Sequence, residues 1–144
     1  MTRPCYNGHT MATIDERFHP MLGRFFTPQE VEVCRLHFQG LPVRIISLPW
    51  LRRRAAAITF GHHVFLRPDH WEQLSFPRQA GLLAHEMTHV RQYRRYGLVP
   101  FLALYNVVYP LYFWRVSQHP LEKPAYQRGQ EVEALAQESS PSPP

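Results

Sequence analysis

The sequence predicts a small α+β domain, and three features carry this prediction. A capped amphipathic segment begins at Thr27, two short apolar and β-branched runs follow at residues 41–48 and 57–66, and a long amphipathic segment extends from about Pro77 to Tyr96. The chain has 144 residues, which is enough for one compact domain with a core. Because 44% of the residues are hydrophobic and 19% are charged, we expect a globular protein and not a disordered chain.

The charge and cysteine content set broad limits on partners and compartment. Lys and Arg outnumber Asp and Glu by 16 to 11, so the basic surface permits acidic partners, but no recognised nucleic-acid-reading motif is present and no specific nucleic acid is predicted. Cys5 and Cys34 are too few for a disulfide framework, which favours a reducing compartment. Residues 1–9 lack the apolar run of a secretory signal, so we expect a cytoplasmic protein, with export by a specialised secretion route left open.

Residues 1–26 are predicted to form an irregular N-terminal segment, because they show no sustained period and contain several helix and strand breakers. The domain itself is predicted over residues 27–136. A Ser- and Pro-rich tail at residues 137–144 should be disordered.

The first predicted helix begins with Thr27 as N-cap, Pro28 at the first helical position and Glu30 completing a capping box, and it should end at Gly40. Cys34 falls on the inner stripe of this helix and is interpreted as an inert core residue. The following runs, 41–48 and 57–66, predict a small sheet with a hairpin around Gly61 and His62. The histidines of that turn are not expected to be ligands. Arg52, Arg53 and Arg54 between the runs are interpreted as a solvated loop cluster.

The long helix is predicted to begin near Pro77 and to end at Tyr96, where Gly97 supplies the C-terminal stop. Within it, His85 and His89 are one helical turn apart. Their imidazoles should therefore project together from one face of the helix.

This spacing gives the segment a specific chemistry. Imidazoles one turn apart can bind a single zinc ion, each at about 2.0–2.1 Å. Glu86, rotated about a third of a turn from His85, is poorly placed as a ligand but well placed to hold a zinc-bound water and to take its proton. The composition gives roughly a 3% probability that His-Glu-x-x-His arises by chance. The sequence therefore predicts a zinc site with His85 and His89 as ligands and Glu86 as the catalytic base.

A catalytic zinc ion usually has a third protein ligand, which must lie further along the chain. The longer signature with a third histidine six residues after the second is excluded, because that position is Arg95. Glu122 follows Pro120 in the first turn of another predicted helix and is the expected ligand. The alternatives for this ligand are His119, Glu131 and Glu133.

The run Leu82-Leu83-Ala84-His85-Glu86-Met87-Thr88-His89-Val90-Arg91-Gln92-Tyr93 resembles the zinc helix of gluzincin-type metallopeptidases. Over residues 55–136 the chain also resembles small bacterial metallopeptidase-like domains associated with contractile injection or secretion systems. The resemblance implies a minimal zincin-like fold with a small sheet, the zinc helix and a following glutamate-ligand helix. It also implies zinc held by His85, His89 and Glu122.

The activity implied by the resemblance is hydrolysis of peptide bonds, with a peptide or protein as substrate and Glu86 activating the metal-bound water. Substrates of such enzymes lie along the edge strand that precedes the zinc helix, which the resemblance places within residues 57–66. Many gluzincins have an aspartate four residues after the ligand glutamate, whereas this chain has Tyr126. The alternative is a noncatalytic zinc-stabilised interaction module whose partner belongs to a secretion or injection apparatus.

Two further questions stay open at this level. Tyr93, His119 and Tyr126 are all candidates for an oxyanion donor.

Residues 97–114 carry no formal charge, but a membrane span would place the histidines and Glu122 on opposite sides of the bilayer. A buried or substrate-facing helical segment is therefore preferred, and peripheral membrane association remains an alternative.

Overall fold

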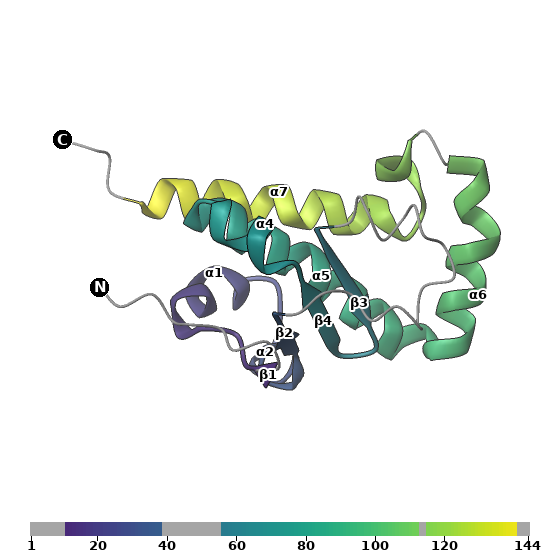
Figure 1. Cartoon of the computed structure of the whole chain (residues 1–144), viewed down its shortest axis with the longest axis horizontal. Helices are drawn as coiled ribbons and strands as arrows, with labels where there is room; N and C mark the ends of the chain where they lie inside the picture. The colour runs from purple at the N-terminus through teal and green to yellow at the C-terminus, as the bar shows by residue number, and fades with distance from the viewer. Residues whose placement is uncertain (1–10, 39–55, 113–114, 141–144) are drawn as a thin grey trace.

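The structure is a computed structural model that describes residues 11–38, 56–112 and 115–140. It confirms the α+β class, with a small mixed sheet and a mainly helical remainder (Figure 1). The strands are β1 (Met11–Ala12), β2 (Arg35–His37), β3 (Ala57–Phe60) and β4 (His63–Leu66). The α-helices are α1 (His19–Leu22), α2 (Pro28–Val33), α4 (Pro68–Gln73), α5 (Phe76–Tyr96), α6 (Leu98–Val108) and α7 (Glu122–Ser139). Short 3-10 turns are η1 (Glu16–Phe18), η2 (Tyr109–Tyr112) and η3 (Val116–Gln118).

The sheet has the strand order β1-β2-β4-β3, which places β3 at one edge. β2 pairs with β4 in parallel, and β3 and β4 form an antiparallel hairpin. Gly61 turns this hairpin with φ of 63°, a conformation that glycine adopts without strain. The predicted hairpin around Gly61 is thus confirmed, whereas the strand predicted at residues 41–48 and the arginine cluster at 52–54 lie outside the described residues.

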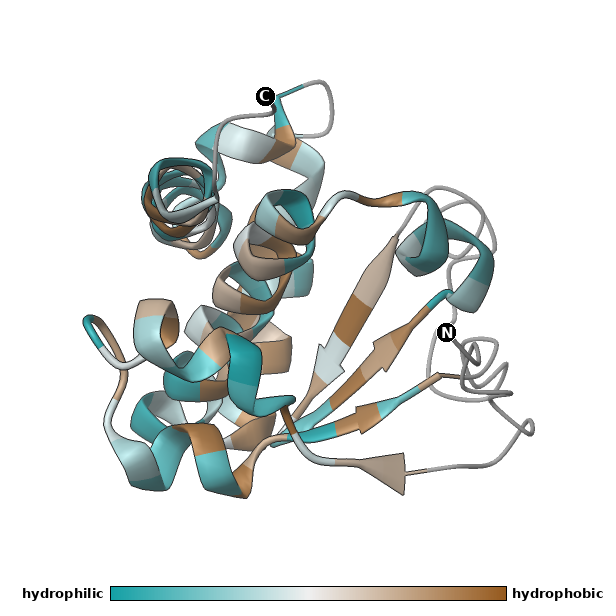
Figure 2. Cartoon of the chain, turned by 90° about the vertical axis from the view of Figure 1, so that its left-hand side faces the viewer, coloured by the Kyte–Doolittle hydropathy of each residue, from teal (hydrophilic) through white to brown (hydrophobic). Residues whose placement is uncertain are grey.

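α5 is the central element of the fold and lies between α7 and the sheet (Figures 1 and 2). Its predicted ends are confirmed, because Ser75 precedes it and Gly97, with φ of 83°, ends it. One face of α5 buries small and medium apolar residues against the inner side chains of the sheet, such as Val64 and Leu66. This burial fixes which face of α5 remains available to α7.

α5 and α7 approach each other at a pair of glycines. A Cβ added to Gly129 would lie 2.9 Å from the carbonyl oxygen of Gly81, and a Cβ added to Gly81 would lie 2.9 Å from the carbonyl oxygen of Gly129. Both obstructing atoms belong to the backbone and cannot move aside as a flexible side chain would. The close contact of the two helices therefore requires glycine at both positions.

The N-terminal part differs from the prediction in two ways. The capping box is present, with Thr27 and Glu30 bonded to each other's backbone, but α2 ends at Val33 and not near Gly40. The chain becomes extended at Cys34 because residues 35–37 pair with β4, which overrides their local helical pattern. Residues 11–26, predicted to be irregular, contain β1, η1 and α1, and their apolar side chains enter the core.

The later part of the chain agrees more closely with the prediction. Residues 98–112 form α6 and η2, which confirms the predicted helix, but much of this segment is exposed and not buried. None of the described helices combines the length and the apolar character needed to cross a membrane. α7 extends to Ser139, further than residue 136, where the sequence predicted the end of the domain.

The glycine contact yields a test in which two effects have opposite signs. In an ordinary helix, Gly→Ala stabilises by about 1 kcal/mol. We expect Gly129→Ala to destabilise the protein by about 1–3 kcal/mol, because its Cβ would overpack the contact with Gly81. Denaturant unfolding followed by circular dichroism would measure this change. Gln130→Ala, at an exposed position of the same helix, is the control, and a more stable Gly129→Ala variant would contradict the close contact.

Candidate metal centre

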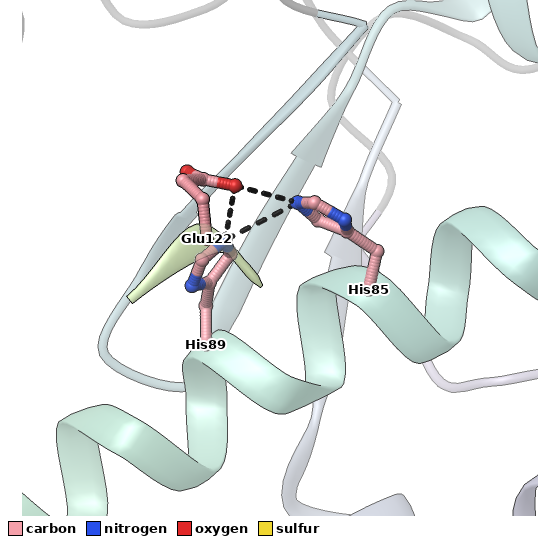
Figure 3. A group of neighbouring side chains, drawn as sticks. All are labelled: His85, His89 and Glu122. Atoms are coloured by element: carbon pink, nitrogen blue, oxygen red, sulfur yellow. Dashed lines mark hydrogen bonds and ion pairs between the residues drawn. The ribbon is translucent and has the colours of Figure 1, made fainter. Parts of the chain in front are cut away.

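Two helices bring three metal-binding side chains together. His85 and His89 project from adjacent turns of α5, and Glu122, the first residue of α7, faces them (Figure 3). Glu122 Oε2 lies 3.2 Å from His85 Nε2 and 3.4 Å from His89 Nε2. The two imidazole Nε2 atoms are 3.3 Å apart. Among the described residues, these three form the one group whose donor atoms are close enough to share a metal ion.

The separations fit a tetrahedral ion. Two ligand atoms at 2.0–2.1 Å from one zinc ion and at the tetrahedral angle lie about 3.3 Å apart, which matches all three measured distances. Two imidazoles and one carboxylate are also the donor set of many catalytic zinc sites, which keep a fourth position for water or substrate. The donor chemistry therefore fits zinc, although other divalent transition metals accept the same donors.

Electrostatics within the cluster are strong because its members are buried. Burial alone would raise the pKa of Glu122, but the hydrogen bonds and charges of His85 and His89 hold this pKa well below the usual range of a glutamate. Burial alone would lower the pKa of His89, but the hydrogen bond and charge of Glu122, aided by Glu86 and Gln92, raise it to about 9. Without a metal ion, the protonated imidazole of His89 is therefore the positive charge that pairs with the Glu122 carboxylate.

Gln92 orients one of the histidines. Its side-chain oxygen lies 2.9 Å from His89 Nδ1, and because an amide oxygen can only accept, Nδ1 carries the proton and Nε2 faces the cluster. The Gln92 amide nitrogen donates to the carbonyl of Leu121 at 2.8 Å, immediately before the ligand helix. This role of Gln92 was not predicted from the sequence, although position 92 lies one turn after His89 and could have indicated it.

Tyr105 and His119 support Glu122 from the opposite side. The Tyr105 hydroxyl donates to Glu122 Oε1 at 2.8 Å, which leaves Oε2 for the histidines. Burial and the nearby Glu122 carboxylate raise the pKa of Tyr105, so the hydroxyl keeps its proton. His119 is fully buried beside Tyr105 and accepts a hydrogen bond from the Leu121 amide at 3.1 Å through Nδ1. His119 therefore supports the start of α7 and is not one of the clustered donors.

Glu86 lies beside the cluster on α5 and is 4% exposed. Thr59 Oγ1, on the edge strand β3, donates to Glu86 Oε2 at 2.5 Å. The Thr59 carbonyl in turn accepts from the Tyr93 hydroxyl at 3.2 Å, so in this structure that hydroxyl bonds to the backbone of β3. The Thr59 hydroxyl thus fixes Oε2 of Glu86 and does not bond to the other carboxylate oxygen, Oε1.

The remaining candidates fall into clear positions. The ring of Tyr126 packs edge-on against His85 with centroids 4.7 Å apart, and its side chain is partly exposed. His63 Nδ1 lies 2.8 Å from His37 Nε2, so the histidine beside the hairpin turn bonds with β2 and is not part of the cluster. Glu131 pairs with Arg128 at 2.8 Å and is also outside it.

Comparison with known proteins gives one match. The sequence is similar to the eCIS core domain over residues 51–97, which links the chain to proteins of extracellular contractile injection systems. The matched segment covers β3, β4, α4 and α5 and includes His85, Glu86 and His89, but it ends before Glu122. No curated protein and no solved structure gave a match.

The charge state of His89 predicts how metal affinity depends on pH. Its pKa of about 9 in the metal-free protein means that a metal ion must displace a proton from this imidazole at neutral pH. We expect the apparent zinc affinity to rise about tenfold per pH unit from pH 7 up to about pH 9 and then to level off as His89 becomes neutral. Competition titration against a chelator, corrected for the chelator's own protonation, would measure this slope. An affinity independent of pH over that range would contradict the assigned charge of His89.

Proposed function

We propose that this chain is a zinc-binding domain that works with an extracellular contractile injection apparatus. The observation that carries the proposal is the convergence of His85, His89 and Glu122 at separations that fit one tetrahedral ion. The similarity to the eCIS core domain supports the association with the apparatus. A domain of this kind would use zinc for stability and its remaining surface for partners.

Zinc would act as a link between two helices. Glu122 is the first residue of α7, whereas both histidines belong to α5, so one ion would tie the start of the last helix to the centre of the fold. Binding to the folded state alone stabilises that state by mass action. Gln92 and Tyr105 would hold the ligands in orientation before the ion arrives.

Metal content is the direct test of this centre. We expect protein purified without chelators to contain close to one zinc ion per chain, and His85→Ala and Glu122→Ala to lose it because each removes a ligand. Glu86→Gln is the matched control, since Glu86 is buried beside the ligands but is not among the clustered donors. Elemental analysis of folded protein gives the stoichiometry. Wild-type protein that takes up no zinc even when it is supplied would refute the proposal.

A second function, zinc-dependent hydrolysis of peptide bonds, is favoured by Glu86. Bound zinc would polarise the scissile carbonyl and activate a water molecule. Thr59 tethers one oxygen of Glu86, which leaves the other to take a proton from the attacking water and to deliver it to the leaving amine. Tyr126, partly exposed beside His85, is the best placed of the three candidates to donate to a developing oxyanion.

The edge strand supplies a place for the substrate of such an enzyme. β3 pairs only with β4 within the described part of the chain, and Thr59 connects this strand to Glu86. An extended peptide could add to β3 as a further strand through backbone hydrogen bonds. Its scissile bond would then lie near Thr59, next to both Glu86 and the metal ligands.

Turnover separates the two proposed functions. If the domain is a peptidase, we expect Glu86→Gln to keep its zinc and to lose about 100- to 10,000-fold in cleavage rate, because the general base is gone. Cleavage of a mixed peptide library by the zinc-loaded chain, followed by mass spectrometry, would measure this. Equal cleavage by both proteins would indicate a contaminant. No cleavage by the wild type would leave the noncatalytic module as the function.

A further inference from the structure

One face of α6 carries apolar side chains that nothing in the described structure covers. The following residues of α6 and η2 form this α6 ridge: Val99, Leu104, Val107 and Leu111. Three of them, Val99, Val107 and Leu111, are 73%, 75% and 73% exposed. The opposite face of the same segment contributes Phe101, Tyr105 and Tyr109 to the interior. In Figure 1, α6 forms one end of the molecule, on the right.

Positive charge flanks the α6 ridge at both ends. Arg94 and Arg95 are exposed in the last turn of α5, directly before α6, and Arg115 is exposed just after η2. No aspartate or glutamate occurs between residues 87 and 121. The α6 ridge is therefore an apolar surface whose nearest charged residues in the sequence, on both sides, are all arginines.

We propose that the α6 ridge binds the surface of an anionic lipid bilayer, with α6 lying in the plane of the interface. In this orientation the aliphatic side chains enter the boundary between headgroups and acyl chains. Arg94 and Arg95 at one end and Arg115 at the other then reach lipid phosphates at the same depth. One anionic bilayer would thus contact both the apolar residues of the ridge and the arginines beside it.

A second copy of the chain fits this surface less well. Because arginines flank both ends of the ridge, a parallel pair and an antiparallel pair would each bring arginine side chains against arginine side chains. Aliphatic contact would favour the pair, but the like charges at its margins would oppose it. An anionic bilayer can contact the apolar face with its acyl chains and the arginines with its headgroups.

The α6 ridge and the metal centre share a helix but not a face. Tyr105, which donates to Glu122, lies on the inner side of α6, while the ridge lies on the outer side. Lipid binding therefore does not depend on bound zinc or on Glu86. Failure of the lipid proposal would leave the proposed zinc function untouched, and the reverse also holds.

Sedimentation with lipid vesicles tests the proposal on the full chain. We expect the protein to sediment with vesicles of phosphatidylcholine and phosphatidylglycerol, and only weakly with phosphatidylcholine alone. The triple variant Val99→Ser, Leu104→Ser, Val107→Ser should lose at least about tenfold in partition coefficient, because it removes the apolar contact. Arg94→Gln, Arg95→Gln, Arg115→Gln should lose about 100-fold on anionic vesicles, because each arginine contributes about 1 kcal/mol near anionic headgroups.

Matched controls separate the α6 ridge from bulk charge and hydrophobicity. Arg17→Gln, Arg24→Gln, Arg78→Gln removes the same net charge from exposed sites elsewhere, and Met11→Ser removes an exposed apolar side chain from β1. Both controls should bind vesicles as the wild type does. Circular dichroism and zinc content should stay unchanged in every variant, which shows that the fold is intact.

Three results would overturn the proposal. One is absence of wild-type binding to anionic vesicles, and another is equal loss in the ridge variants and their controls. The third result takes one of two forms. Light scattering shows a dimer that the ridge variants dissociate, or an acidic protein displaces the chain from vesicles and requires the same residues. In that third case the α6 ridge would be a protein interface.

Discussion

The close contact between Gly81 and Gly129 is the constraint on which the rest of the site depends. It lets α7 pack against α5 backbone to backbone, two turns beyond the start of α7 at Glu122. Glu122 then reaches the same small volume as the two histidines of α5. A bulkier residue at either glycine would push the helices apart, and donor atoms at 3.2–3.4 Å would no longer fit one ion. A Cβ added to Gly129 would also lie 3.5 Å from the His85 Cβ, so this packing sits directly beside a ligand and determines the geometry of the site.

The features that were predictable from sequence are those that local rules decide. The ends of α5 follow from Pro77 and Gly97, and the spacing of His85 and His89 requires only the period of a helix. The capping box at Thr27 is equally local. Glu122 is different, because the resemblance to metallopeptidases and a first-turn position suggested it among four candidates. Its approach to the histidines depends on the contact of α5 and α7, which no local pattern records.

Other features could not be predicted because long-range pairing decides them. Residues 35–37 carry a helical pattern, but the parallel pairing of β2 with β4 buries Leu36 and makes them a strand. The supporting hydrogen bonds follow the same logic. Gln92 could be found from its helical spacing to His89, whereas Tyr105 and His119 come from segments whose position is set only by packing. The sequence therefore indicated the donors of the centre better than the residues that orient them.

Glu86 is the residue on which the two proposed functions differ. Holding zinc requires only the three donors, and Glu86 is not one of them. A carboxylate that is 4% exposed and hydrogen-bonded to the Thr59 hydroxyl carries a desolvation cost that an apolar side chain of similar size would avoid. The negative charge of Glu86 also favours protonated His89, so an electrostatic role and proton transfer beside a metal are both reasons for a glutamate at this position. The geometry of the ligands serves either proposed function, and only the proposed hydrolysis requires the carboxylate beside them.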